Sequence, residues 1–83
     1  NQFRIYPNPS HGELFIQAGQ LALDQISSMQ LVNVLGQEME ISTTQVGESI
    51  EIRTNQQDAG VYFLRIQLDN GSWASWKIDF LEK

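Results

Sequence analysis

The sequence predicts an all-β domain, namely an antiparallel, immunoglobulin-like β-sandwich of about seven short strands. Three observations lead to this prediction. Apolar and polar residues alternate over short segments, which is the period of a strand with one buried face. Glycine, proline, asparagine and aspartate separate these segments at the spacing typical of sandwiches. No helical period is sustained along the chain.

The first expected strand, residues 3–6, leads into the most informative stretch of the chain, residues 6–12. Two prolines stand there with one residue between them. Each proline fixes φ at about −65° and lacks an N–H group, and it disfavours helical backbone in the residue before it. Asn8 and Ser10 can hydrogen-bond to their own backbone, and the glycine at the end permits a positive φ. We therefore expect a stiff corner before a second strand, residues 13–17, with the first strand at a sheet edge.

The region after the second strand, as far as residue 41, predicts shorter and less regular elements. Leu21 and Leu23 continue the two-residue period, which favours a ragged edge strand at this point. Residues 28–34 predict the third clear strand, and Gly36 supplies the turn that ends it. Residues 38–41 alternate again and are expected to pair back with that strand as a hairpin.

The second half of the chain predicts the most regular strands. Residues 42–48 are expected to be a polar loop, residues 49–53 a fifth strand, and residues 54–59 a polar segment without a helix. Residues 61–68 alternate most strongly. Asp69-Asn70-Gly71 predicts a hairpin with a two-residue turn, and residues 72–80 return as the last strand.

Composition limits the classes of function that this chain can have. The formal net charge is −5, which disfavours binding to nucleic acids or to anionic membranes. The chain has no cysteine, which excludes disulfides and thiolate metal sites. No apolar run is long enough to span a membrane. At 83 residues, and without an initiator methionine, the chain is expected to be one small domain taken from a longer protein.

Several short motifs follow one another in a fixed order along the chain. They are Tyr6-Pro7-Asn8-Pro9, Gly12, Leu14 and Ile16, then Val32-Asn33-Val34-Leu35-Gly36-Gln37, then Ala59-Gly60-Val61-Tyr62-Phe63-Leu64, and finally Trp76-Lys77-Ile78. Along the whole chain, this order resembles the C-terminal sorting domain of the type IX secretion system of Bacteroidetes, in its type A family. The end of the chain departs from the family pattern of alternating Val and Lys, because Lys77 is followed by Ile78-Asp79-Phe80-Leu81-Glu82-Lys83.

The resemblance implies a non-catalytic secretion signal without a cofactor. A cargo protein would carry this domain, residues 1–83, at its C-terminus through the periplasm. The outer-membrane type IX translocon would bind the domain, and a sortase-like cysteine protease would usually remove it. The cargo would end at the cell surface or in the medium. From the negative net charge and the absence of a long apolar run, we expect no contact with nucleic acid and no direct insertion into the membrane.

The residues expected to contact partners come from the motif blocks and the last strand. One expected mode is strand addition at an exposed sheet edge. The prolines, Gly36 and Gly60 are explained first by the backbone conformations that they adopt. Open edges of small sandwiches can also pair with each other, so an edge-strand dimer is a further expectation. The expected partner-binding residues are Tyr6, Pro7, Asn8, Pro9, Gly36, Gly60, Tyr62, Trp73, Lys77 and Lys83.

The two tryptophans support an alternative function. Trp73 and Trp76 are an odd number of residues apart, so in a regular strand they face opposite sides. Trp76 is in phase with the apolar face, and Trp73 is therefore expected to be the exposed one. An exposed tryptophan can stack on a sugar ring or anchor a partner. The alternative is a carbohydrate-binding or adhesion module, which would need at least two exposed coplanar aromatics among Trp73, Phe15 and Phe63.

Other candidate sites are weaker. His11 is the only histidine, so a solvated turn residue is favoured over a metal ligand or a catalytic base. Asp69-Asn70-Gly71 resembles part of a calcium loop but lacks acidic residues at the other ligand positions. An enzyme is poorly supported, and a passive spacer between domains remains a further alternative.

Overall fold

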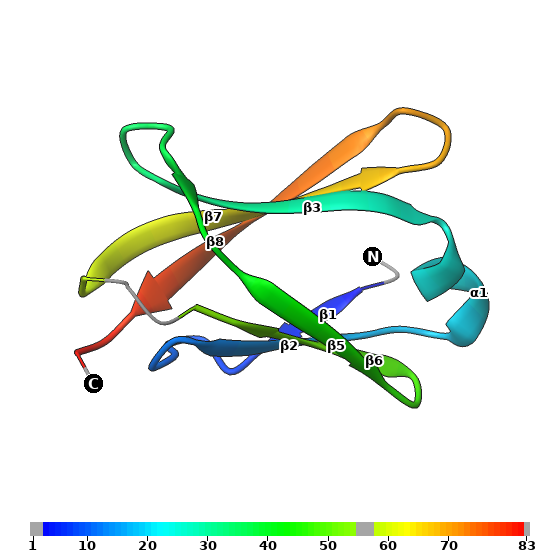
Figure 1. The fold of residues 1–83 in the computed structure, drawn as a ribbon, viewed down its shortest axis with the longest axis horizontal. Coiled ribbons are helices and arrows are strands. Elements are labelled where there is room, and N and C mark those ends of the chain that lie inside the picture. Colours follow the sequence, from blue (N-terminus) through cyan, green and yellow to red (C-terminus); the bar gives the residue numbers. More distant parts are fainter. Residues whose placement is uncertain (1–2, 55–57, 83) are drawn as a thin grey trace.

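Two antiparallel four-stranded sheets face each other in the computed structural model, which describes residues 3–54 and 58–82 (Figure 1). The first sheet has the strand order β1-β2-β6-β5, and the second has the order β4-β3-β7-β8. The prediction of an all-β sandwich is confirmed, with eight strands in the described residues. The elements are β1 (Arg4–Tyr6), β2 (Glu13–Gln17), α1 (Gln20–Asp24), β3 (Ile26–Asn33), β4 (Glu38–Met39), β5 (Ser42–Val46), β6 (Ser49–Arg53), β7 (Gly60–Leu68) and β8 (Trp73–Phe80).

The hydrophobic core lies between the two sheets and is built from every second residue of the strands. On β7 the inward residues Leu64 and Ile66 are completely buried, and Ile78 on β8 pairs with Tyr62 in the same layer. The alternation predicted for the last two strands is therefore confirmed. The buried apolar residues are Phe3, Leu14, Ile16, Leu23, Leu31, Ile50, Ile52, Tyr62, Leu64, Ile66, Ile78 and Phe80.

The prediction of a ragged strand around Leu21 and Leu23 is wrong, because this segment is the short helix α1. The helix carries the chain from the first sheet to the second at one end of the sandwich (Figure 1). Residues two apart point in different directions on a helix, and Leu23 is accordingly buried while Leu21 is 76% exposed. A helix of five residues is too short to show a helical period in the sequence. No helix in the described part of the chain is long and apolar enough to cross a membrane.

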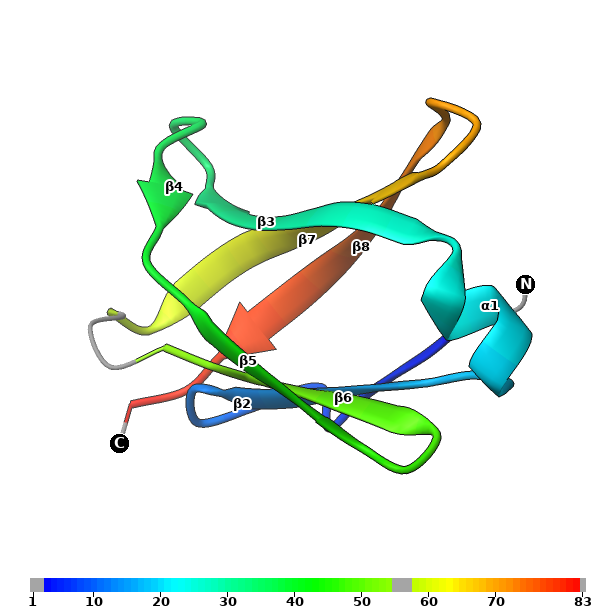
Figure 2. The same cartoon turned by 45° about the vertical axis from the view of Figure 1, so that its right-hand side comes forward.

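The prediction of a polar loop over residues 42–48 is also wrong, because the segment contains strand β5. The chain crosses from β4 in the second sheet to β5 in the first (Figure 2). All five residues of β5 are exposed, so neither face needs apolar residues and no alternation appears. Main-chain pairing with β6, from Ser42↔Arg53 to Val46↔Ser49, holds the strand in place.

The hairpin predicted between the last two strands is confirmed, but its turn has three residues instead of two. The N–H of Gly71 donates to the carbonyl of Leu68 (2.9 Å), and the N–H of Leu68 donates to the carbonyl of Ser72 (2.9 Å). Gly71 has φ +88°, and no described residue other than glycine has a positive φ. Asn70 therefore does not take the left-handed conformation that a two-residue turn requires of it.

Substitutions of buried residues should lower the free energy of unfolding much more than substitutions of exposed residues. Leu64 is completely buried, whereas Val46 is 63% exposed. We expect Leu64→Ala to lower the free energy of unfolding by about 2–5 kcal/mol, because it removes buried carbon and leaves a cavity. Val46→Ala should change it by less than about 0.5 kcal/mol. Urea titration followed by tryptophan fluorescence measures both values, and equal losses would contradict the described core.

Candidate functional site

The side chain of Asn8 forms part of the hydrogen-bonding edge of β8. Its Nδ2 group donates to the carbonyl of Lys77 (2.9 Å), and its Oδ1 atom accepts the N–H of Asp79 (3.0 Å). A primary amide offers a donor and an acceptor side by side, as a peptide group does in a strand. Pro7 and Pro9 have no N–H to donate. The Asn8 side chain thus replaces main-chain contacts that its neighbours cannot make, rather than bonding to its own backbone as predicted.

The main chain of Ser10 continues the same contact toward the end of the chain. Its N–H donates to the carbonyl of Asp79 (2.9 Å), and its carbonyl accepts the N–H of Leu81 (2.7 Å). Ser10 and Phe80 form an isolated parallel bridge. Residues 8–10 therefore lie along the outer edge of β8, in the manner of a short added strand.

The hydroxyl group of Ser10 stabilises the corner through hydrogen bonds to the residues that follow it. Its Oγ atom accepts the N–H groups of Gly12 (3.2 Å) and Glu13 (3.1 Å). Ser10 is 1% exposed although it is polar, and these bonds compensate its burial. The predicted bonding of Ser10 to its own local backbone is confirmed. The corner connects β1 to β2, which pair antiparallel with β1 at the sheet edge, as predicted.

His11 extends the contact by one more residue. Its Nδ1 atom lies 2.9 Å from the carbonyl oxygen of Glu82, and the ring is exposed. With the proton on Nδ1, the ring donates to that carbonyl. Across residues 3–54 and 58–82, no group of three or more histidine, aspartate or glutamate side chains is arranged to hold a metal ion.

Tyr6 lies on the outer face of the first sheet, away from β8. Its ring stacks on Phe15, the residue with which it pairs, at 5.6 Å between centroids and 23° between planes. The Arg4 guanidinium lies 5.9 Å from the centre of the Tyr6 ring. The Tyr6–Pro7 and Asn8–Pro9 peptide bonds are both cis, and the two prolines are exposed. The motif therefore has its aromatic group on one sheet and its asparagine on the other.

Three of the expected site residues have clear structural roles. Gly36 has φ +82° in the turn between β3 and β4, and Gly60 has φ +147° at the start of β7. Tyr62 is buried, and its hydroxyl group donates to the carbonyl of Asp58 (2.8 Å) and accepts the N–H of the same residue (3.1 Å). This pair of bonds fixes the chain just before β7.

Trp73 and Lys77 both point outward from β8, Trp73 at the first residue of the strand and Lys77 four residues later. Trp73 is 43% exposed, and the Arg65 guanidinium lies 4.7 Å from the centre of its ring. Trp76 faces the core, where its ring meets Phe3 edge-on at 5.9 Å. The predicted orientations of the two tryptophans are therefore confirmed. Lys77 contributes the carbonyl that binds Asn8, and Lys83 lies outside the described residues.

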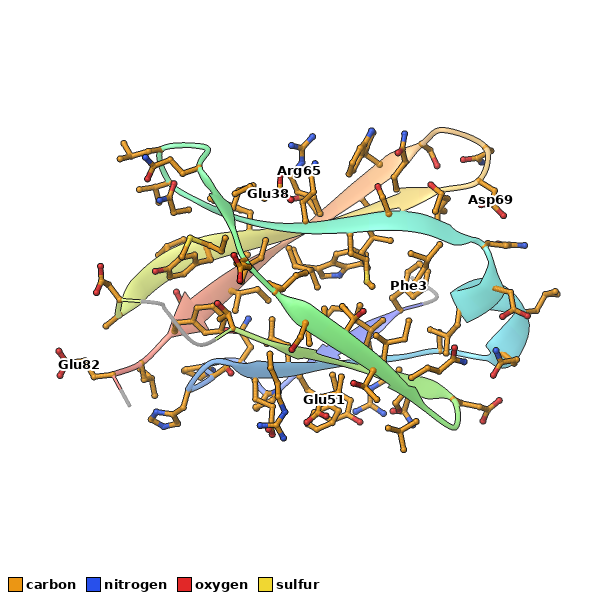
Figure 3. All side chains as sticks on the ribbon, in the orientation of Figure 1. Phe3, Glu38, Glu51, Arg65, Asp69 and Glu82 are labelled. Carbon is orange, nitrogen blue, oxygen red and sulfur yellow. The ribbon has the colours of Figure 1, made fainter. Side chains whose placement is uncertain are left out.

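The outer face of the first sheet carries a small ion cluster. The Arg53 guanidinium lies 2.8 Å from the Glu13 carboxylate and 2.7 Å from that of Glu51. A hydrogen bond to Glu51, together with the negative charge of Glu13, raises the pKa of Arg53. The cluster joins three neighbouring positions on β2 and β6, because Glu13 pairs with Arg53. Its third member, Glu51, is labelled in Figure 3. Arginine is charged at any physiological pH, so the guanidinium of Arg53 stays cationic.

Comparison with known families identifies the chain. A family model described as "Secretion system C-terminal sorting domain" matches residues 4–78. The chain belongs to this family. No curated protein and no solved structure matches it.

The region that matches the family model contains both the corner and most of the last strand. This region begins in β1, includes Asn8 and Ser10, and ends in β8 at the residue after Lys77. The chain thus carries a sorting signal for type IX secretion, and such a signal directs export to the cell surface or release. Sequence reasoning identified the corner and β8 separately but missed that Asn8 binds β8, and it missed Arg65 on Trp73.

The structure also bears on the alternative of a carbohydrate-binding module. The exposed aromatic residues in the described part of the sorting domain are Tyr6 and Trp73. They lie on different sheets, and Phe15 and Phe63 are only half-exposed or less. The Arg65 guanidinium further covers the Trp73 ring. The pair of exposed coplanar aromatics that this alternative needs is therefore absent from the described residues.

The contact of Asn8 with β8 predicts a specific loss of stability. We expect Asn8→Ala to lower the free energy of unfolding by about 1–2 kcal/mol, since each hydrogen bond contributes roughly 0.5–1.5 kcal/mol net. The N–H groups of Asp79 and Leu81 should exchange faster with solvent, which hydrogen exchange followed by NMR measures. Gln17→Ala, at an exposed position on β2, is the matched control. Unchanged protection of the Asp79 amide in Asn8→Ala would contradict the role assigned to the side chain.

Proposed function

We propose that this sorting domain is the non-catalytic signal that directs an exported cargo protein to the outer-membrane translocon of type IX secretion. The domain comprises residues 1–83 and acts at the C-terminus of a larger secreted protein. It passes through the periplasm with its cargo, and a sortase-like protease removes it at the outer membrane. The cargo is then attached to the cell surface or released.

The observation that carries this proposal is the family match over residues 4–78, combined with the contact between the corner and β8. The corner and the last strand lie at opposite ends of the matched region. Because Asn8 and Ser10 hydrogen-bond to β8, both ends of the signal belong to one folded unit. This supports recognition of the domain in its folded form rather than as an extended peptide.

The sheet edges suggest where a partner strand can pair. Residues 8–10 occupy the outer edge of β8 near its end, between Lys77 and Leu81. A strand added there would have to displace the corner. In the first sheet, β5 is at the edge and is exposed along its whole length. We therefore assign strand addition, by the translocon or by a second copy of the domain, to the β5 edge.

A secretion assay tests the proposed function. Residues 1–83 are fused to the C-terminus of a fluorescent reporter that is exported to the periplasm, in Bacteroidetes strains with and without a working type IX translocon. We expect the reporter outside the outer membrane only in the strain with the translocon. Periplasmic retention of a folded fusion in both strains would contradict the proposal, and circular dichroism of the purified fusion checks folding.

Removal of the last two residues tests whether the signal extends beyond the folded core. The core ends at Phe80, and Leu81 is still bound by Ser10. Deletion of residues 82–83 should therefore leave the melting temperature within a few degrees of the parent value. Because we propose that the translocon reads the end of the domain, we expect the same deletion to abolish secretion. Secretion and thermal unfolding are measured on the same fusion. Normal secretion of this truncation would show that the translocon does not require these residues.

A further inference from the structure

The turn between β3 and β4 presents two aliphatic side chains to solvent. Val34 is 69% exposed and Leu35 is 79% exposed. Single exposed apolar residues are common on protein surfaces. Two consecutive exposed aliphatic residues in a turn are less common, because turns favour glycine, proline, asparagine, aspartate and serine. In Figures 1 and 2 this turn projects beyond the two sheets.

The β3–β4 turn is held firmly in one conformation. The Oδ1 atom of Asn33 accepts the N–H groups of Leu35 (2.9 Å) and Gln37 (2.9 Å), and its Nδ2 group donates to the Gln37 side chain (2.9 Å). The main chain adds a bond from the N–H of Gly36 to the carbonyl of Asn33 (3.0 Å). Val34 and Leu35 are thus exposed on a fixed backbone, and a partner that binds them need not order the turn.

The second sheet contains a turn of the same geometry with different residues at its tip. In the β7–β8 turn, Gly71 has φ +88° and bonds to Leu68, as Gly36 with φ +82° bonds to Asn33. The positions equivalent to Val34 and Leu35 hold Asp69 and Asn70. This backbone therefore forms with ordinary polar turn residues, and its geometry does not require Val34 and Leu35.

We propose that Val34 and Leu35 are an anchor that enters an apolar pocket on a protein of the translocon. The inference rests on the proposed function and names the part of the domain that the partner contacts. Glu38 and Glu40 are exposed just after the turn, and Glu38 lies on the outer side of the second sheet (Figure 3). By charge complementarity, basic residues border the pocket. The same carboxylates and the net charge of −5 oppose binding to an anionic lipid surface.

The test replaces the anchor without changing the turn or the charge. The reporter fusion is prepared with Val34→Ser and Leu35→Asn together, since both residues suit a turn of this type. A matched control exchanges the polar residues of the other turn, with Asp69→Asn and Asn70→Asp. A conservative variant, Val34→Ile with Leu35→Met, keeps the tip apolar. Thermal unfolding of each purified domain establishes that the fold is intact.

We expect the anchor variant to be secreted about tenfold less or worse, as when an interface anchor is truncated. The control and the conservative variant should be secreted as well as the parent. Equal secretion of the anchor variant and the parent overturns the inference alone. Failure of the parent fusion to leave the periplasm refutes the proposed function, and the inference falls with it.

A cross-linking experiment identifies the occupant. A photoreactive amino acid at position 35 is activated in secreting cells, with position 70 as the control. An adduct between position 35 and a translocon protein, with none from position 70, supports the inference. An adduct with a second copy, or no adduct, overturns it. Binding of the purified parent, but not of the anchor variant, to phosphatidylcholine vesicles also overturns it, because lipid is then the occupant.

Discussion

The hydrogen bonds between residues 8–10 and β8 join the beginning of the domain to its end. Asn8 and Asp79 are separated by 71 positions in the sequence, and their bond links the connection between β1 and β2 in the first sheet to β8 in the second. The core lies between these sheets, so this contact closes the sandwich at the edge where β8 would otherwise be open. An open edge exposes unpaired main-chain groups to any other strand. The contact thus joins the two sheets and pairs main-chain groups at the end of β8.

The chemistry of the corner explains the combination of two prolines with an asparagine. The prolines stiffen the backbone but remove two N–H groups at the place where β8 needs donors and acceptors. The asparagine side chain supplies one donor and one acceptor from a single planar group. Aspartate lacks the donor, and alanine lacks both groups. The corner can therefore cover β8 and remain unable to extend as a strand that others could join.

Sequence reasoning predicted the elements that have one buried face and failed where no such face exists. Residues 49–53 alternate because Ile50 and Ile52 face the core, and this strand was predicted with its observed bounds. Strand β5 is exposed on both sides, so its sequence carries no alternation. The contact of Asn8 with β8 could not be predicted, because a pairing between distant segments leaves no local pattern. The orientation of Trp73 could be predicted, because it follows from counting positions along one strand.

The two similar turns of the second sheet show which turn positions the fold determines and at which positions it accepts different residues. Both turns depend on a glycine with positive φ and on a side-chain amide oxygen. The Asn33 oxygen accepts the N–H groups of Leu35 and Gln37, and the Asn70 oxygen accepts the N–H of Ser72. The remaining tip positions are determined by neither packing nor backbone geometry. In the corner, by contrast, the side chain of Asn8 and the main chain and hydroxyl group of Ser10 hold the fold. A secretion partner can therefore select among folded sandwiches through side chains that the fold does not use, and aliphatic residues at a solvent-exposed tip meet that condition.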